Sequence, residues 1–379
     1  MKNKQSQSRE ARNERALEIL AKNDDYDIIN NPSLIEIVEG YSGRGGVKGH
    51  LNEYYTAPVM ARTILEVLPQ LGYQQALVLE PSCATGRFMD NAPRKWLFHG
   101  IEIDPTSSRI AKILHGDKAV IENSDFRRFA MLQLQNGEQP EVYDVVIGNP
   151  PFGTFTVNPG DLEATNYGRD LSHNRFECFF VEECLRMLKP GGILAMVLPH
   201  SCLSGQSLTG WRKRLTGLGG TFLGAMRFPQ DTHDDTVVVT DAWFMVKSPK
   251  IQVSDTQSAF QMGNWFLEES NRQFILGTEA TRQRFGEDVY TVVGAIPKDL
   301  DEITLKFVTA LRSQIRYFRL RPSSCANRVE IGGRTANIVQ GQWEINSVKI
   351  CDNLPDLDIA ELLEMDFPQL VSVATGNRR

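Results

Sequence analysis

The stretch DVVIGNPPFG, residues 144–153, joins a run of branched aliphatic side chains to Asn-Pro-Pro-Phe, with a glycine on either side. Adjacent valines and isoleucine favour a buried β-strand, and two prolines end it because they donate no hydrogen bond to a sheet. Proline also pushes the preceding Asn149 out of the helical region, and the second proline stiffens the turn. The stretch therefore predicts a buried strand that ends in a rigid turn.

Strands and helices alternate on both sides of this stretch, which indicates an α/β fold with a mainly parallel sheet covered by helices on both faces. The expected strands, each a short apolar run, are residues 76–80, 98–103, 118–123, 143–149, 193–199, 221–228 and 236–247. The last two are close enough along the chain to pair antiparallel. Ligands of such folds bind at the carboxyl ends of the strands.

The composition is that of an ordinary globular chain. It has 379 residues, 41% of them hydrophobic and 23% charged, and a net charge of −6. No apolar run approaches the roughly 18 residues of a membrane span, and the start, MKNKQSQSREARNER, is too polar for a signal peptide, so we expect a cytoplasmic protein. The six cysteines form no pair with zinc spacing, and no metal is expected.

Small and polar residues follow the expected strand 76–80 in the sequence EPSCATGRF, residues 80–88. Small side chains let the backbone approach a ligand closely, and amides at the start of a following helix would favour a negative group such as a carboxylate. A plain strand-to-helix turn would explain Pro81 and Gly86 equally well. The stretch is a candidate ligand-binding loop.

Acidic residues end two further strands. Glu102, in HGIEID, can accept hydrogen bonds from both hydroxyls of a ribose, although a solvated carboxylate would look the same. Asp125, in NSDF, can accept from an adenine amino group while Phe126 packs on the ring. Asp125 equally suits the N-cap of a helix.

The Asn-Pro-Pro-Phe turn offers two hydrogen-bond acceptors side by side. The side-chain oxygen of Asn149 and the carbonyl of Pro150 together suit a planar amino group with two N–H donors. Phe152 is placed to stack on the ring that carries this amino group. A plain proline turn would need neither the asparagine nor the phenylalanine, which favours the functional interpretation.

These motifs, in this order, resemble the adenine-N6 branch of the DNA amino-methyltransferases, of the phage, plasmid or restriction-modification type. EPSCATGRF is similar to that family's EPSAGTGxF cofactor loop, and GNPPFG is similar to its catalytic motif. Upstream, GRGGVKGHLNEYYTAP resembles its N-terminal cofactor segment. The resemblance spans roughly residues 41–247. It departs from the family pattern at Ala84, which replaces a glycine, and at Ala57, which separates Thr56 from Pro58.

The resemblance implies a Rossmann-like class I S-adenosylmethionine-dependent methyltransferase fold, with seven mostly parallel strands and an antiparallel final strand. It also implies S-adenosylmethionine as cofactor and transfer of its methyl group to N6 of an adenine flipped out of duplex DNA. The implied catalytic residues are Asn149, Pro150, Pro151 and Phe152. The implied cofactor-binding residues are Tyr55, Thr56, Glu80, Ser82, Gly86, Phe88, Glu102, Ile103, Asp125, Phe126 and Asn149.

Three segments are expected: a polar or helical segment (1–40), the methyltransferase domain (41–250) and a C-terminal extension (251–379) that contacts DNA or recognises the target. Segment 152–175 follows the catalytic motif directly and is either a loop that closes on the flipped base or a surface insertion. Basic side chains are candidate phosphate contacts, although solvated charge explains any one of them as well. They are Arg212, Lys213, Arg214, Arg316, Arg319 and Arg321.

The same motifs leave other substrates open. Adenine in RNA, N4 of cytosine and a protein glutamine amide all present a planar amine or amide, as adenine in DNA does. A degenerate methylase fold that only binds DNA or a partner is a further alternative, and Ala84 alone favours it. The expected partner is duplex DNA, with no membrane, and either a specificity subunit or a second copy of the chain can supply further recognition.

Overall fold

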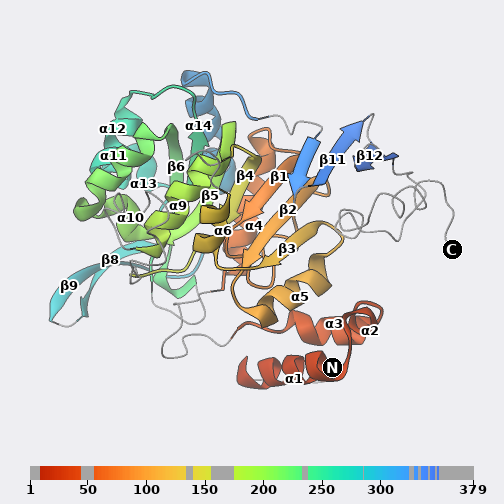
Figure 1. The fold of residues 1–379 in the computed structure, drawn as a ribbon. Coiled ribbons are helices and arrows are strands. Elements are labelled where there is room, and N and C mark those ends of the chain that lie inside the picture. The colour runs from red at the N-terminus through yellow and green to blue at the C-terminus, as the bar shows by residue number, and fades with distance from the viewer. Residues whose placement is uncertain are drawn as a thin grey trace.

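The computed structural model describes residues 9–43, 55–133, 140–154, 175–232, 238–284 and 286–323, together with four backbone strands within 328–349 (Figure 1). Those four form a separate antiparallel sheet. They are β10 (Arg328–Ile331), β11 (Arg334–Val339), β12 (Gln342–Ile345) and β13 (Val348–Lys349). Within the described ranges no helix combines the length and the apolar character needed to cross a membrane.

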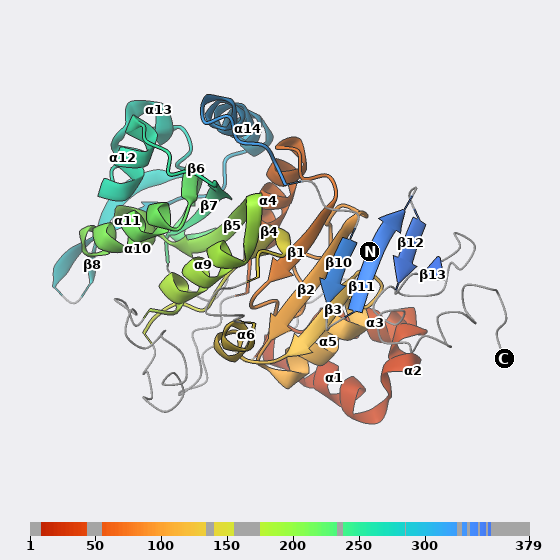
Figure 2. The ribbon, with the colours of Figure 1, turned by 45° about the horizontal axis from the view of Figure 1, so that its top comes forward.

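A seven-stranded sheet forms the centre of the molecule, in the order β3-β2-β1-β4-β5-β7-β6 (Figures 1 and 2). Neighbours pair parallel except at β7, which runs antiparallel to both β5 and β6. The predicted α/β class, the mainly parallel sheet and the antiparallel last strand are confirmed. The strands are β1 (Ala76–Glu80), β2 (Trp96–Glu102), β3 (Ala119–Asn123), β4 (Tyr143–Gly148), β5 (Leu188–Pro199), β6 (Gly220–Phe228) and β7 (Thr240–Lys247).

The central strands are buried along their whole length, as parallel strands covered on both faces must be. Their apolar runs supply most of the core. The one carboxylate inside β4, Asp144, is fully buried. It accepts hydrogen bonds from the Leu77 backbone N–H at 2.9 Å and from Lys189 Nζ at 3.0 Å, which offsets the cost of burying it.

Helices fill the connections between the strands. The helix α11 contacts both α9 and α12, while α4 contacts α14. Among the described residues from 58 to 217, the helices are α4 (Pro58–Gln70), α5 (Pro105–His115), α6 (Phe126–Leu132), α9 (Phe176–Met187), α10 (His200–Ser204), η1 (Gln206–Leu208) and α11 (Thr209–Gly217). A short turn, η2 (Gln230–Thr232), follows β6.

The described part of the predicted C-terminal extension shares the main core. Phe260, Trp265 and Phe307 belong to the same cluster of buried side chains as the central strands. A two-stranded hairpin projects from this region at the lower left of Figure 1. The elements are α12 (Asp255–Met262), η3 (Trp265–Leu267), α13 (Glu269–Arg272), the hairpin strands β8 (Thr278–Arg284) and β9 (Glu287–Val293), and α14 (Leu300–Tyr317).

Three helices precede the sheet and form a unit of their own, the α1–α3 unit: α1 (Arg9–Lys22), α2 (Asp25–Ile29) and α3 (Pro32–Glu39). Asn31 caps α3 by accepting from the Ser33 N–H, and Pro32 opens the helix. The unit packs on α5 through a second hydrophobic cluster, formed by Ala16, Leu20, Ile28, Val38 and Tyr41 with Ile110 and Ile113 of α5.

Candidate functional site

A cavity lies at the carboxyl ends of β1, β2 and β4. It is partly open to solvent, and about 820 Å³ of space lies between its walls and the solvent at its mouth. Strand ends and the first residues of the following helices form its walls. The lining residues are Tyr55, Thr56, Glu80, Pro81, Ser82, Cys83, Ala84, Arg87, Glu102, Ile103, Ser107, Ser124, Asp125, Phe126, Asn149, Pro151, Phe176 and Phe180.

Glu102 is held in place by the backbone. Its Oε2 accepts from the Ala84 N–H and its Oε1 from the Asp104 N–H, both at 2.7 Å. Glu102 is only 7% exposed and lines the cavity at the end of β2. The two backbone N–H groups therefore fix the orientation of the carboxylate at the cavity wall.

Ala84 adopts a conformation that usually requires glycine, with φ at 48°. For an L-residue the left-handed region costs about 1–2 kcal/mol, more than the roughly 0.5–1 kcal/mol that glycine costs through chain entropy. We therefore expect Ala84→Gly to raise the free energy of unfolding by about 0.5–1 kcal/mol. Urea unfolding of both proteins measures the difference, and an unchanged or lower value would show that Ala84 is not strained.

The chain from β1 to β2 forms successive turns, not the expected helix. Hydrogen bonds between residues three apart, such as Gly86 N–H to the Cys83 carbonyl, repeat along it. The prediction of helix amides facing a carboxylate is therefore wrong here. Gly86 and Phe88 also do not line the cavity: Gly86 packs against His115, and Phe88 is 1% exposed in the core.

Glu80 ends β1 and is 2% exposed. Its Oε2 has no hydrogen-bond partner among the residues that the structure describes. Burial, with smaller contributions from the charges of Asp90 and Glu102, raises its pKa well above the ordinary 4.5. A buried, unpartnered carboxyl group that lines a cavity is expected to meet a cationic group of a ligand.

The Asn149–Gly153 turn is tied to its surroundings at both ends. Ser82 Oγ donates to the Asn149 carbonyl at 3.2 Å, which links the turn to the end of β1. At the other end, Gly153 N–H donates to Glu177 Oε2 at 3.1 Å, and Phe176 N–H donates to the Gly153 carbonyl at 2.9 Å. Thr154 also forms a β-bridge with Arg175, so the two flanks of segment 155–174 lie side by side.

Only part of the predicted catalytic turn lines the cavity. Asn149 and Pro151 do, whereas Pro150 and Phe152 are buried behind it. The ring of Phe152 is 7% exposed, and its stacking on a base stays a prediction. Residues 155–174, which make up most of the predicted closing loop, lie outside the described residues, as do residues 44–54 of the N-terminal cofactor segment.

Asp125 has the structural role that the sequence left open, because it caps α6 by accepting from the Arg127 N–H at 2.8 Å. Its carboxylate also pairs with the Arg127 side chain, Nε to Oδ2 at 3.0 Å. Asp125 nevertheless lines the cavity beside Phe126. A ligand that contacts the Asp125 carboxylate would therefore share this carboxylate with Arg127.

Several lining residues were missed by the sequence analysis. Phe176 and Phe180 are one turn apart on α9, and the Phe180 ring lies 4.6 Å from that of Phe126. Together the three rings form an aromatic wall. Their spacing by four residues could have indicated one helical face, but nothing in the sequence shows that this face meets the cavity. Ser107, Ser124 and Arg87 were missed for the same reason.

The predicted phosphate contact is wrong for Arg212, which is fully buried. Its guanidinium donates to the carbonyls of Cys202 at 3.0 Å, Gly205 at 2.9 Å and Gln261 at 3.1 Å. Its neighbour Lys213 is exposed, and Arg214 pairs with Glu182. Arg212 therefore ties α11 to α10 and α12.

We expect Arg212→Ala to lower the free energy of unfolding by about 3 kcal/mol, because it leaves three carbonyls without their hydrogen-bond donor and creates a cavity. Urea unfolding measures the loss, with Lys213→Ala as the exposed control on the same helix. A loss no larger than that of the control would contradict the structural role.

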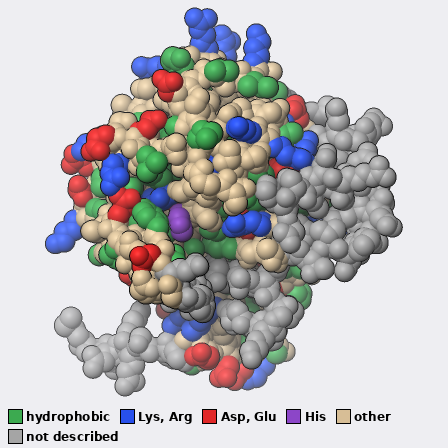
Figure 3. All heavy atoms as spheres, turned by 90° about the vertical axis from the view of Figure 1, so that its left-hand side faces the viewer, with side chains coloured by type: hydrophobic (Ala, Val, Ile, Leu, Met, Phe, Trp, Pro, Cys, Tyr) green, Lys and Arg blue, Asp and Glu red, His purple; other side chains and the backbone are tan. Residues whose placement is uncertain are grey.

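The predicted phosphate contacts near residue 320 lie at the amino edge of the sheet, away from the cavity, and stay predictions. Arg312 donates to the Gln70 carbonyl just before β1, and Ser323 donates to Gly191 near the start of β5. Arg316, Arg319 and Arg321 belong to this amino edge, which is the opposite edge of the sheet from the cavity. On the face in Figure 3, acidic and basic side chains are interspersed among the coloured residues.

The sheet order and the position of the cavity define a class I methyltransferase fold, as predicted. Residues 90–217 match the model of the family described as Eco57I restriction-modification methylase. The resemblance to restriction-modification DNA methyltransferases, first seen in the motifs, is confirmed by this match and by the relatives below.

Two relatives and one solved structure illustrate the likeness. The "Defense against restriction protein B" of Escherichia phage P1 is 30% identical over 332 residues, covering 82% of this chain and 14% of that protein. Type II methyltransferase M.CvrRI of Paramecium bursaria Chlorella virus XZ-6E is 32% identical over 148 residues, covering 38% of this chain and 35% of that protein. The chain thus spans well under two thirds of either relative.

The solved structure is the type I restriction-modification system methyltransferase subunit from Streptococcus thermophilus. It aligns with a TM-score of 0.47 at 18% identity, covering 78% of this chain and 60% of that one.

Proposed function

We propose that the protein transfers a methyl group from S-adenosylmethionine to the N6 amino group of adenine in DNA. The observation that carries this proposal is the meeting of Glu80, Glu102 and Asn149, from the ends of three adjacent parallel strands, on one cavity. Acidic groups for a cationic cofactor and an amide acceptor for an amine thus face the same space.

The acidic residues that line the cavity support this cofactor. S-adenosylmethionine carries an ammonium and a sulfonium group, and it supplies an electrophilic methyl group when bound. Glu80 offers the buried carboxyl group that such a cation needs. Glu102 would accept from the ribose hydroxyls, and Ile103, which is 45% exposed, would pack on the adenine.

The remaining lining residues would complete the cofactor site. Tyr55, Thr56 and Ser82 would hold the methionine end, while Asp125 and Phe126 would face the adenine. Gly86 and Phe88 are left out of this set, because they do not line the cavity.

Asn149 and Pro150 would prepare the target amine. Its lone pair is delocalised into the adenine ring, which makes it a poor nucleophile. Asn149 lines the cavity wall, whereas Pro150 does not, and the role of Pro150 is carried over from the motif alone. If the two N–H groups of the amine donate to Asn149 Oδ1 and the Pro150 carbonyl, a tetrahedral nitrogen with a localised lone pair is favoured. Positioning of the reacting atoms can lower the barrier by about 7–11 kcal/mol. Flipping the base costs a few kcal/mol, and aromatic stacking returns about 1–3 kcal/mol of this.

The test is to incubate the purified chain with S-adenosylmethionine labelled in the methyl group and, in parallel, with duplex DNA, RNA and protein. After digestion, the modified base or side chain is identified by mass spectrometry. Label in N6-methyladenine from DNA is the expected result. Label in N4-methylcytosine, in RNA or in glutamine would replace DNA adenine as the substrate. No labelling while the cofactor still binds would favour a non-catalytic protein, or DNA presented by a specificity subunit or a second copy.

A further inference from the structure

We propose that the α1–α3 unit is part of the cofactor site, with Asn13 and Arg109 as positioning residues for Tyr55 and Ser107. The inference rests on the proposed function, because Tyr55 and Ser107 are assigned to the cofactor by their place in the cavity wall. Contacts lead from Asn13 of α1 through Gly43 to Tyr55 in the cavity wall. From Ser107 and Arg109 of α5, further contacts lead back to the end of α1.

The first link joins α1 to the segment that follows α3. Asn13 donates through Nδ2 to the Gly43 carbonyl and accepts through Oδ1 from the Ser42 N–H at 3.0 Å. Arg9 adds a bond from Nη2 to the Ser42 carbonyl at 2.8 Å. Because these bonds hold both Ser42 and Gly43, they fix the position of these two residues relative to α1.

The second link joins Gly43 to the cavity wall. Gly43 has φ at 67°, and a Cβ built on it would lie 2.5 Å from the ring of Tyr55. The ring therefore rests directly on the glycine backbone. The Tyr55 hydroxyl in turn lies 3.3 Å from Ser107 Oγ on α5, and both residues line the cavity.

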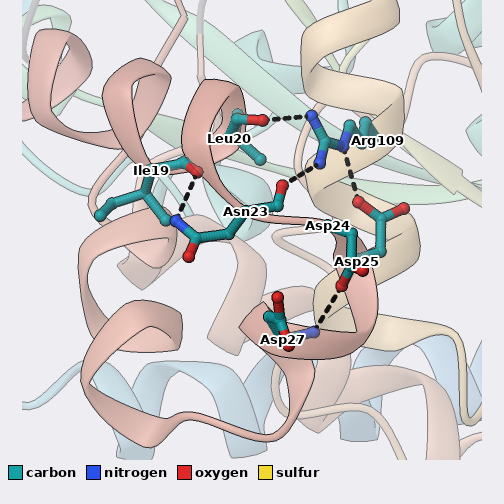
Figure 4. Close-up of polar contacts among 7 residues, drawn as sticks. All are labelled: Ile19, Leu20, Asn23, Asp24, Asp25, Asp27 and Arg109. Atoms are coloured by element: carbon teal, nitrogen blue, oxygen red, sulfur yellow. Dashed lines mark hydrogen bonds and ion pairs between the residues drawn. The ribbon is translucent and has the colours of Figure 1, made fainter.

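The third link returns to the α1–α3 unit from α5. Figure 4 shows the Arg109 guanidinium reaching across to the turn between α1 and α2. It donates to the carbonyls of Leu20 at 2.7 Å and Asn23 at 3.1 Å, and to the Asp25 carboxylate at 2.7 Å. Arg109 is two residues beyond Ser107, so this clamp also fixes the part of α5 that faces the cavity.

Hydrophobic contacts also join the α1–α3 unit to α5. The core of the α1–α3 unit is completed by Ile110 and Ile113 of α5, the helix that carries Ser107 and Arg109. Loosening either polar link should therefore shift Tyr55 relative to Ser107 without disturbing the sheet. Glu80, Glu102 and Asn149 belong to the sheet edge and would keep their places.

The experiment measures binding of S-adenosylmethionine to the full chain by calorimetry without DNA, and then steady-state kinetics with DNA. We expect Asn13→Ala, Gly43→Ala and Arg109→Ala each to raise the Kd for the cofactor by about tenfold, as small misplacements of positioning groups do. We expect kcat at saturating cofactor to stay within about twofold of the parent, since only uniform binding is lost. The exposed neighbours Glu14→Ala on α1 and Lys112→Ala on α5 are matched controls.

Equal Kd values for the Asn13 and Arg109 variants and their controls would overturn the inference. Asn13→Ala and Gly43→Ala keep the hydrophobic core of the unit, so they decide the matter even if Arg109→Ala unfolds. A parent chain that binds no S-adenosylmethionine would overturn the proposed function and this inference with it. A raised Kd in the variants of a parent that binds cofactor but methylates no DNA would support the inference alone.

Discussion

Replacing Asn149 with alanine is expected to lower kcat for methyl transfer by about 100- to 1,000-fold, the usual cost of losing one preorganised hydrogen-bonding group at a reacting centre. Asn149 lines the cavity at the end of β4, and its backbone carbonyl is already fixed by Ser82 Oγ at 3.2 Å. The substitution therefore removes the side-chain acceptor without freeing the turn. Binding of the cofactor should be nearly unchanged, because the acidic strand ends remain.

Two further variants sharpen this test. Asn149→Asp keeps an acceptor oxygen in the same place and should recover part of the lost rate. Asn91→Ala replaces an exposed asparagine in the turns between β1 and β2 and should behave like the parent. Single-turnover kinetics with DNA and calorimetry with cofactor separate the two steps. If Asn149→Ala kept kcat within about tenfold, the amide would not hold the amine.

Replacing Glu80 with glutamine is expected to weaken binding of S-adenosylmethionine by roughly 10- to 100-fold, since a hydrogen bond to a charged group contributes about 1.5–3 kcal/mol. Glu80 is the buried carboxyl group whose Oε2 lacks a partner in the described chain. Glutamine has nearly the same shape but cannot become an anion. The exposed Glu36→Gln on α3 serves as the matched control.

The same residue predicts how binding depends on pH. Burial raises the pKa of Glu80 well above 4.5, so the group stays protonated to a higher pH than an ordinary glutamate and ionises as the pH rises through that raised pKa. Affinity for a cationic cofactor should therefore increase with pH over this interval. Binding should also release a proton, which calorimetry in buffers of different ionisation enthalpy detects. A pH profile identical in Glu80→Gln would exclude this role.

Stability should change in the opposite direction. A carboxyl group whose pKa is raised in the folded state binds more protons there than in the unfolded chain. The cofactor-free protein therefore loses stability as the pH rises from about 4.5 to the folded-state pKa of Glu80. Glu80→Gln removes that loss and should unfold at higher temperature at neutral pH, although it binds cofactor more weakly. Differential scanning calorimetry at several pH values measures both trends.

Local patterns were enough to predict the sheet. The apolar runs that became β1, β4 and β6 were placed within one residue of their observed ends, because strands buried along their whole length leave a continuous hydrophobic signature. The acidic and amide residues that end β1, β2 and β4 were also found, since the carboxyl ends of parallel strands converge.

Features that depend on distant contacts were not predictable. Arg212 looks like any surface arginine in sequence, and only the carbonyls of α10 and α12 make it a buried structural residue. The arginines near residue 320 are basic and clustered, but the direction of α14 places them at the amino edge. The helix expected after Gly86 gave way to turns, whose hydrogen bonds no periodicity reveals.

The pairing of Thr154 with Arg175 has a consequence for how this protein can diversify. The chain leaves the site and returns to it at neighbouring points, and the buried Glu177 secures the junction through Gly153 N–H. The length of whatever connects those points adds little cost, since doubling a loop costs only about 0.6 kcal/mol. The strand ends can therefore keep their spacing when the number of residues between Thr154 and Arg175 changes.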